Sequence, residues 1–496
     1  MSENTGSSRK VITNSIIYTA CGLLQKCFSF FLLPLYTAYL SPNDYGVTNI
    51  ANSFLSTMSF VAAFSLYSAV SRFYVELKHD KEKLRRFYGS VLIFVFVSCL
   101  IIGVLLTIFR DLLTTYVFVG IDYYPVVLVC LVQLVFSCQH TLHTYILRSQ
   151  QKAMKCSLLT LAYFFVNLGL SISFVVVWKM GALGVLLAGA LSAVIYTVYF
   201  IIDMCWHKEI RFCMDFSLLK DALKYSIPIM PHNLSTHIAH LVSNILIGGT
   251  SSLSNLGIYS VAAQFANIAD TVQNYVDSAY GPWLYEKLHD QEQGYKNSIR
   301  QVAGLLIAVI GLFMLGIALF AQDYILLLVQ KSYAFAWRYV PWIVLVYAIK
   351  TMYYFYVEVL FYYKKASRML FIATFTGSVV NVFLSAFMIP QWGVYGSIVA
   401  DGVAMVIRVG IIVFISKRFD DVGLRLRDFL LDIFIVGMFV FLGLAPSYVK
   451  YQETFNFVNL LYKIVVVVVY ICVQGFIHRK TAGTLGKMLL NKLRRR

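Results

Sequence analysis

The chain has 496 residues, of which 59% are hydrophobic and only 13% are charged. Soluble proteins carry about 25% charged residues, so this composition excludes an ordinary soluble domain and indicates a polytopic membrane protein. The net charge of +17 would suit nucleic acid, but its placement along the chain, described below, argues against that partner.

Apolar runs of about 20 residues, the length that crosses a bilayer, recur along the whole chain. We predict roughly fourteen transmembrane helices joined by short connections, with no inserted soluble domain. They cover residues 11–37, 46–70, 88–109, 124–147, 156–178, 181–203, 223–248, 256–283, 299–321, 340–362, 369–390, 393–416, 428–446 and 456–477.

Lys and Arg residues concentrate in alternate connections. With the N-terminus in the cytoplasm, most of the 41 Lys and Arg residues fall on the cytoplasmic side, with clusters at 72–86, 208–224 and 479–496. The positive-inside rule therefore predicts a multi-pass protein with both termini in the cytoplasm. These Lys and Arg residues orient the chain in the membrane and face anionic lipid. The net positive charge therefore needs no nucleic-acid partner to explain it. The tail 481–496 is expected to be an interfacial helix or a disordered end.

Three segments recur in order at nearly one spacing. Asn43–Phe54 aligns with Ser254–Phe265, Gln151–Ala153 aligns with Lys364–Ala366, and Gly181–Tyr196 aligns with Gly393–Arg408. A repeat of six helices keeps both halves in the same orientation. The predicted fold class is therefore an all-α integral membrane protein with two pseudo-symmetric six-helix lobes around a central cavity.

The repeat divides the chain into three predicted parts. Residues 1–206 form the N-terminal lobe, 207–418 form the C-terminal lobe, and 419–496 hold two extra spans and a basic tail.

Polar side chains recur at helical spacing in Tyr225–Trp283, which otherwise reads as two spans. The series comprises Asn233, His237, His240 and Asn244, then Gln264, Asn267, Asp270, Asn274 and Asp277. Other spans carry Lys26, Asn49, Asn52, Lys350, Asp401 and Arg408. Because a charge at the bilayer centre is costly, these side chains should face the bundle interior or a water-filled cavity.

Structural explanations of these polar groups stay open. Lys26, Lys350 and Arg408 could pair with Asp270, Asp277, Glu358 or Asp401 only to hold helices together. The histidines at 232, 237 and 240 could be interhelical hydrogen-bond partners rather than proton-relay groups. Asp432 and Lys463 lie near span ends and are expected to snorkel to the interface. Pro228 and Pro231 could kink the seventh span or serve as a hinge.

No enzyme motif, ATP-binding loop or metal-ligand spacing is present in the sequence. The nine cysteines are scattered, so we expect no disulfide framework. The longest outside connection, near 321–340, holds one acid, Asp323. That is too little for the acidic catalytic loop of a membrane glycan polymerase or glycosyltransferase.

Leu32–Gly46, with Pro34, Leu40 and Tyr45–Gly46, resembles the start of Wzx-type polysaccharide flippases. These belong to the multidrug/oligosaccharidyl-lipid/polysaccharide exporter superfamily. Further pieces that resemble this family are Ser71–Glu76, Leu147–Ala153, Tyr225–Pro231 and Gly257–Ile268. One departure is Ser243–Asn244, which stands where relatives often carry a charged pair.

The resemblance implies translocation of an undecaprenyl-pyrophosphate-linked oligosaccharide by alternating access across the bacterial cytoplasmic membrane. Membrane lipids and other polysaccharide-assembly proteins are the further expected partners. No cofactor is expected beyond coupling to H⁺ or Na⁺.

On this interpretation the predicted binding and coupling residues have separate roles. The substrate-binding residues are Lys26, Asn49, Asn52, Asn233, Gln264, Asn267, Lys350 and Arg408. The ion-coupling residues are His237, Asp270, Asp277 and Asp401. Lys and Arg suit the pyrophosphate, because Arg offers a planar fork to phosphate oxygens.

Two rival functions belong to the same superfamily, and a third is enzymatic. An ion-coupled multidrug antiporter would need an acidic cavity for cationic drugs, whereas cations and acids are roughly balanced here. This antiporter is the nearest rival, and a flippase for the peptidoglycan lipid precursor is another. The third is the membrane glycan polymerase or glycosyltransferase considered above.

Overall fold

The computed structural model describes residues 2–290, 293–363 and 369–479, and the regular structure within these ranges is helical. Each of the fourteen predicted spans coincides with helix, so the all-α membrane fold class is confirmed. Eleven helices in the described ranges are long and apolar enough to cross a membrane, and one bent pair makes a twelfth. The predicted tail helix at 481–496 lies outside the described residues.

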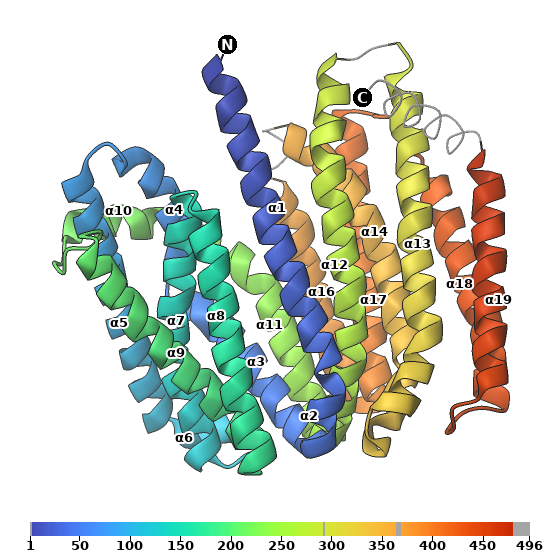
Figure 1. Ribbon diagram of the computed structural model, residues 1–496, viewed down its shortest axis with the longest axis horizontal. Helices are drawn as coiled ribbons and strands as arrows, with labels where there is room; N and C mark the ends of the chain where they lie inside the picture. The colour runs from blue at the N-terminus through green and yellow to red at the C-terminus, as the bar shows by residue number, and fades with distance from the viewer. Residues whose placement is uncertain (1, 291–292, 364–368, 480–496) are drawn as a thin grey trace. The chain divides into compact units, whose positions relative to one another are not determined.

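The first of two compact units comprises residues 1–257 and 385–393 (Figure 1). Its helices are α1 (Ser2–Phe31), α2 (Leu33–Tyr39), α3 (Pro42–Ala62), α4 (Leu66–Leu77), α5 (Lys81–Ile108), α6 (Arg110–Tyr116), α7 (Leu128–Ser149), α8 (Ala153–Ile172), α9 (Gly181–Trp206), α10 (Phe216–Ser226) and α11 (Met230–Leu246). Helix α7 packs against α5 and α9, and α11 packs along α3.

The second unit comprises residues 258–384 and 394–496. Its helices are α12 (Leu253–Asp290), α13 (Tyr295–Leu328), α14 (Val340–Tyr362), α16 (Leu370–Trp392), α17 (Val394–Phe419), α18 (Leu426–Val449) and α19 (Phe457–Ile477), except that residues 253–257 of α12 and 385–392 of α16 belong to the first unit. Helix α14 packs along α17, and α13 contacts α14, α18 and α19. The division into lobes at residues 206 and 418 stays a prediction.

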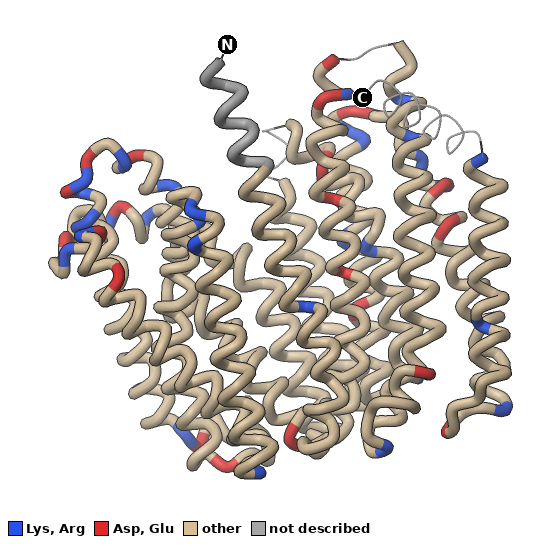
Figure 2. Tube along the Cα trace, viewed as in Figure 1, with Lys and Arg blue, Asp and Glu red and all other residues tan. Residues whose placement is uncertain are grey.

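Basic connections that the sequence assigns to one side lie at one end of the first unit. Lys152 binds Glu209 at 2.5 Å, Lys155 binds Asp203 at 2.6 Å, and Arg211 pairs with Glu82. These pairs join the α4–α5, α7–α8 and α9–α10 connections. Figure 2 shows the positions of Lys, Arg, Asp and Glu gathered near the helix ends and sparse along the middle of the helices.

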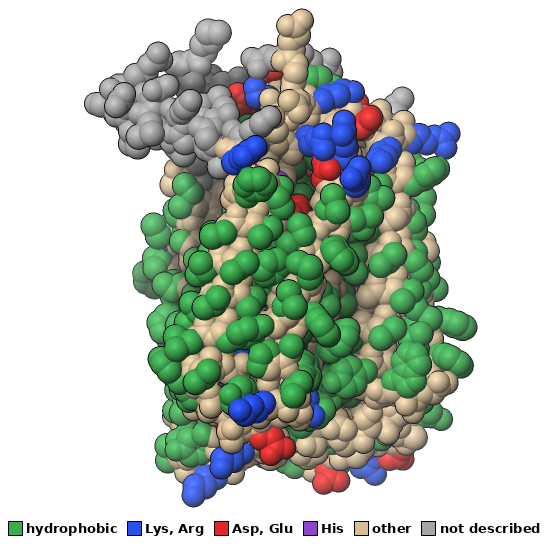
Figure 3. All heavy atoms as spheres, turned by 90° about the vertical axis from the view of Figure 1, so that its right-hand side faces the viewer, with side chains coloured by type: hydrophobic (Ala, Val, Ile, Leu, Met, Phe, Trp, Pro, Cys, Tyr) green, Lys and Arg blue, Asp and Glu red, His purple; other side chains and the backbone are tan. Residues whose placement is uncertain are grey.

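The face formed by α18 and α19 shows how the second unit meets lipid (Figure 3). Hydrophobic side chains cover its middle, and charged side chains lie toward both ends. Exposed members of this surface include Phe434, Phe441, Val465 and Val469. Such a band, bounded by charge, is the surface that a lipid bilayer requires.

Two breaks in the predicted spans have local causes. Helices α3 and α4 bend by 46° where Phe64 and Ser65 adopt positive φ values of 49° and 53°. At Ile227–Ile229 a short 3₁₀ turn separates α10 from α11. Pro228 lies in that turn and Pro231 in the first turn of α11, where a missing N–H costs least.

The internal repeat appears in the structure as a reciprocal contact between α3 and α12. A Cβ at Gly46 would meet the backbone carbonyl of Leu253, and a Cβ at Gly257 would meet the carbonyl of Pro42. Gly46 aligns with Gly257 in the repeat, and Pro42 aligns with Leu253. Each segment thus makes the same contact with the other, which is what a two-fold axis relating the two segments predicts.

The ends of the same segments are also alike. Ser41 Oγ accepts from the backbone N–H of Asp44, and Ser252 Oγ accepts from that of Asn255. At the second pair of repeats, Gly181 and Gly393 precede or open helices with φ values of +57° and +55°. Glycine is favoured there because L side chains rarely adopt such values.

Helix α19 is held to α13 by a buried ion pair. Lys463 is fully buried, and its Nζ lies 2.6 Å from Asp323 Oδ2 and 2.8 Å from Gln322 Oε1. Asp432, 7% exposed, accepts a bond from Gln474 at 3.1 Å. The prediction that Asp432 and Lys463 snorkel is therefore wrong. Asp323 lies within α13 rather than in a loop, so it can neutralise the lysine.

We expect Gly46→Ala to lower the free energy of unfolding by about 1–3 kcal/mol, because the added methyl group meets backbone that cannot rotate away. Gly103→Ala is the matched control, since nothing lies within 4 Å of a Cβ there. Thermal unfolding of the purified protein in detergent measures both. Equal midpoints for the two variants would contradict the close approach.

We expect Lys463→Met to destabilise the protein by about 3–5 kcal/mol, because it leaves Asp323 buried without its cation. Adding Asp323→Leu should restore much of that loss, since the double variant buries no charge. Denaturant titration in micelles compares the two. A double variant no more stable than Lys463→Met would show that the pair is not the cause.

Candidate functional site

Polar side chains of α3 and α11 meet inside the first unit. Asn244 donates to Asn49 Oδ1 at 2.8 Å and to Ser53 Oγ at 2.6 Å. The amide therefore binds two residues one turn apart on α3, which agrees with the shared faces expected from the sequence. Asn244, where relatives often carry charge, is a helix-pairing residue in this chain.

The same helix pair continues with weaker polar contacts. Asn233 Nδ2 lies 3.4 Å from Ser68 Oγ of α4. The backbone carbonyl of His237 accepts from Thr57 at 3.2 Å, and the His237 ring lies 4.9 Å from the Phe60 ring. Asn52 is exposed on α3. The structure thus brings Asn49 to α11, but it does not join Asn52 to that contact.

Lys26 lies on the exposed side of α1. Its neighbour Gln25 donates to the Thr160 carbonyl at 3.1 Å, which holds an adjacent part of α1 against α8. Among the described residues, Lys26 forms no ion pair. Its predicted structural pairing with an acid is therefore not seen in the part of the chain that is described.

A second polar cluster joins α12 and α14 in the second unit. Lys350 Nζ lies 2.6 Å from Asp270 Oδ1. The Tyr354 hydroxyl lies 3.1 Å from the same oxygen and 3.0 Å from Asn274 Oδ1. The ammonium also lies 5.2 Å and 5.4 Å from the ring centroids of Tyr347 and Tyr354. Cation–π contact and the ion pair together stabilise its charge.

Neighbouring positions of α12 have different surroundings. Gln264 and Asn267 are half-buried. Asp277 Oδ1 is buried without a hydrogen-bond partner among the described residues. Two turns further along, the Tyr285 hydroxyl donates to Glu358 of α14, and Gly281 lies against the same carboxylate.

Helices α16 and α17 bring together a third set. Asn381 Nδ2 donates to Asp401 Oδ1 at 2.6 Å. Arg408 lies against Gly377 and within 3.4 Å of Ser378 Oγ, while its buried Nε has no hydrogen-bond partner among the described residues. No described acid lies within ion-pair distance of this guanidinium. A half-buried cation with no acid in direct ion-pair contact can take an anionic ligand.

Three functional candidates were missed from the sequence: Ser378, Asn381 and Tyr354. Ser378, Asn381 and Ser385 recur at spacings of three and four in an apolar span and are all buried. That spacing is the signal that could have identified them. Tyr354 lies in a tyrosine-rich run, where no pattern separates it from its neighbours.

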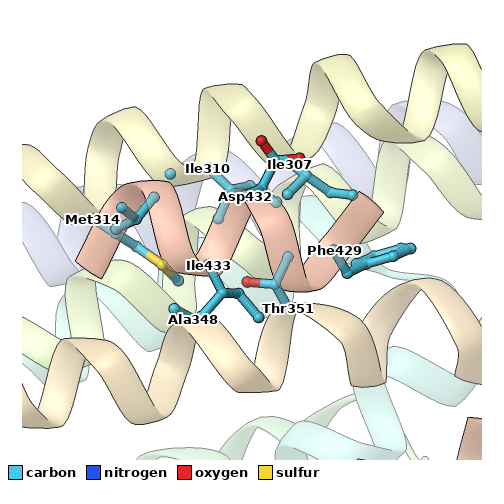
Figure 4. Close-up of a pocket in the computed structure, with 10 residues that line it drawn as sticks. Ile307, Ile310, Met314, Ala348, Thr351, Phe429, Asp432 and Ile433 are labelled. Carbon is cyan, nitrogen blue, oxygen red and sulfur yellow. The ribbon is translucent and has the colours of Figure 1, made fainter. Parts of the chain in front are cut away.

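A small pocket lies between α13, α14 and α18 (Figure 4). Its lining is apolar apart from Thr351 and Asp432, and Thr351 Oγ1 already binds Gln273 at 2.7 Å. The Asp270–Lys350 cluster does not line it. This pocket therefore lacks the polar groups that a charged or sugar-bearing ligand would need.

Comparisons with known proteins agree with this arrangement. A family model described as "Polysaccharide biosynthesis protein" matches residues 11–287, which is more than half of the chain. A search of curated proteins found no match.

Several solved structures share the fold at low sequence identity. The lipid II flippase MurJ, in an inward closed conformation, superposes with a TM-score of 0.71 and 14% identity, covering 94% of this chain and 99% of that one. An inward-facing multidrug resistance MATE transporter gives 0.56 and 16%, covering 86% and 96%. A superfamily transporter from Pyrococcus furiosus, described as having reversed binding-pocket polarity, gives 0.51 and 17%, covering 84% and 96%.

A double-mutant cycle on Asn49→Ala and Asn244→Ala should give a coupling energy of about 0.6–1.7 kcal/mol, the range for interhelical hydrogen bonds in membranes. Asn52→Ala replaces Asn49→Ala in the control cycle, because Asn52 is exposed on the same helix. Unfolding in micelles supplies the energies. The pairing is refuted if the two cycles give the same coupling.

Proposed function

Because the chain belongs to the polysaccharide biosynthesis protein family, we propose that it translocates a polyprenyl-pyrophosphate-linked oligosaccharide. The lipid-linked unit moves from the cytoplasmic to the outer leaflet of the bacterial cytoplasmic membrane, by alternating access, for surface polysaccharide assembly. Both termini lie in the cytoplasm. A proton or Na⁺ drives the cycle, and no other cofactor takes part. The predicted resemblance to Wzx-type exporters is confirmed by the family match and by the fold shared with MurJ and MATE.

Arg408 is the observation that supports this proposal most directly. Its guanidinium is held in the middle of α17, with a buried Nε that no described residue satisfies. Cations inside a membrane protein mark ligand or ion pathways, because leaving them unpaired is costly. A pyrophosphate supplies the acceptor oxygens that Arg408 lacks, and Lys26 is a second cation without a described acid.

The neutral parts of the ligand need hydrogen-bonding groups rather than charge. Asn52, Asn233, Gln264 and Asn267 are amides that face the surface at least in part, and each can both donate and accept. We propose that they contact the oligosaccharide, with Asn49 orienting α11. Asp277, whose buried Oδ1 has no hydrogen-bond partner in the described ranges, is the proposed ion-coupling carboxylate, together with His237 and Asp401.

A strain lacking the protein should lose surface glycan and accumulate undecaprenyl-linked repeat units on the cytoplasmic side. Arg408→Gln combined with Lys26→Met should fail to restore surface glycan, because the pyrophosphate loses both cations. Arg418→Gln is the matched control, an exposed arginine in the last turn of the same helix. Full export by the double variant would overturn the headgroup assignment.

A multidrug antiporter is the second candidate, and the MATE-like fold favours it. The same deletion separates the two functions. An antiporter predicts intact glycan and new sensitivity to cationic drugs, and Asp277 then becomes the residue to mutate first.

A further inference from the structure

Two Lys–Asp ion pairs of equal length lie at membrane depth in the second unit. Both Lys350–Asp270 and Lys463–Asp323 have Nζ–Oδ distances of 2.6 Å. The side chains of the second pair are 0% and 8% accessible, whereas those of the first are 22% and 28% accessible. The buried Lys463–Asp323 pair, the sealed pair, holds α19 to α13 and is not accessible to a ligand. The Lys350–Asp270 pair, the open pair, has the same chemistry, but a ligand can reach both of its charged groups.

The open pair keeps unused hydrogen-bonding capacity. Lys350 has three N–H donors and gives one to Asp270. Asp270 Oδ2 accepts from no described residue, since the printed bonds all reach Oδ1. The single hydroxyl proton of Tyr354 is shared between Asp270 and Asn274. Free donors and free acceptors therefore lie side by side on one accessible surface.

The charge of this cluster decides which ligand it suits. Asp270 neutralises Lys350, so the pair carries no net charge. A phosphate would meet the Asp270 carboxylate, and a cationic ligand would meet the Lys350 ammonium; either repulsion grows where water is scarce. An uncharged hydroxyl group can donate to Asp270 Oδ2 and accept from Lys350 without repulsion, and both bonds are strengthened by the charged partner.

We propose, on the basis of the proposed function, that Asp270, Lys350, Tyr354 and Asn274 form a subsite for the uncharged hydroxyl groups of the sugar. The pyrophosphate is bound elsewhere, at Arg408. Neighbouring hydroxyls on a sugar ring present alternating donors and acceptors, which match the carboxylate, the ammonium and the Asn274 amide. This assigns Lys350 and Asp270 to sugar recognition in place of the headgroup and ion-coupling roles that the sequence suggested.

The test compares two probes on the full-length protein in lipid nanodiscs. One is the undecaprenyl-pyrophosphate-linked oligosaccharide extracted from the deletion strain, and the other is undecaprenyl pyrophosphate without sugar. Tyr354→Phe and Asn274→Ala should each weaken the glycosylated probe about tenfold, the cost of a hydrogen bond to a charged or polar ligand group. Both should leave the bare lipid within about twofold, whereas Arg408→Gln weakens both probes.

Tyr462→Phe is the matched control, because it removes a hydroxyl that binds the Leu442 carbonyl on the lipid-facing α19. Equal loss of both probes in Tyr354→Phe and Asn274→Ala, or no loss of either, overturns the subsite. Asn274 is exposed, so its variant tests the idea even if Tyr354→Phe unfolds. A wild-type protein that binds neither probe better than phosphatidylglycerol refutes the proposed function itself, and a preference for the bare lipid refutes only the sugar subsite.

Discussion

Hydrocarbon offers a polar side chain no hydrogen-bond partner, and this constraint determines which helices adjoin in the two units. Association in a bilayer gains little from the hydrophobic effect, so packing and polar contacts must supply it. Asn244 joins α11 to α3, Lys350 joins α14 to α12, and Lys463 joins α19 to α13. Small residues supply the close packing, because Gly46 and Gly257 let two backbones approach closely.

The same constraint separates structure from function in this chain. A polar group that is sealed among its partners, such as Lys463, stabilises the bundle and is out of reach of a ligand. Within the described part of the chain, Arg408 and Asp277 keep buried atoms without hydrogen-bond partners, and the Asp270–Lys350 cluster keeps accessible donors and acceptors. The candidate functional groups are therefore those whose hydrogen bonding is incomplete, and they lie on α12, α14 and α17.

The positions of the spans could be predicted from the sequence because a membrane imposes a fixed apolar length on each helix. All fourteen coincide with helix, including the polar α11 and α12. The repeat could also be predicted from the sequence, because Gly46 and Gly257 occupy equivalent positions in the two aligned segments. What periodicity does not reveal is which helix lies beside which. Lys463 was assigned to the interface because nothing in its own segment points to Asp323, more than a hundred residues earlier, and Tyr354 was missed for the same reason.

The reciprocal contact of Gly46 and Gly257 has an evolutionary consequence. After a gene duplication, the two copies are free to diverge wherever they do not touch. At this contact each glycine is confined by a backbone carbonyl of the other copy. A larger residue at either glycine would therefore collide with the other segment, and selection should retain both glycines. Sequence similarity between the two halves should persist at this pair after other positions have diverged.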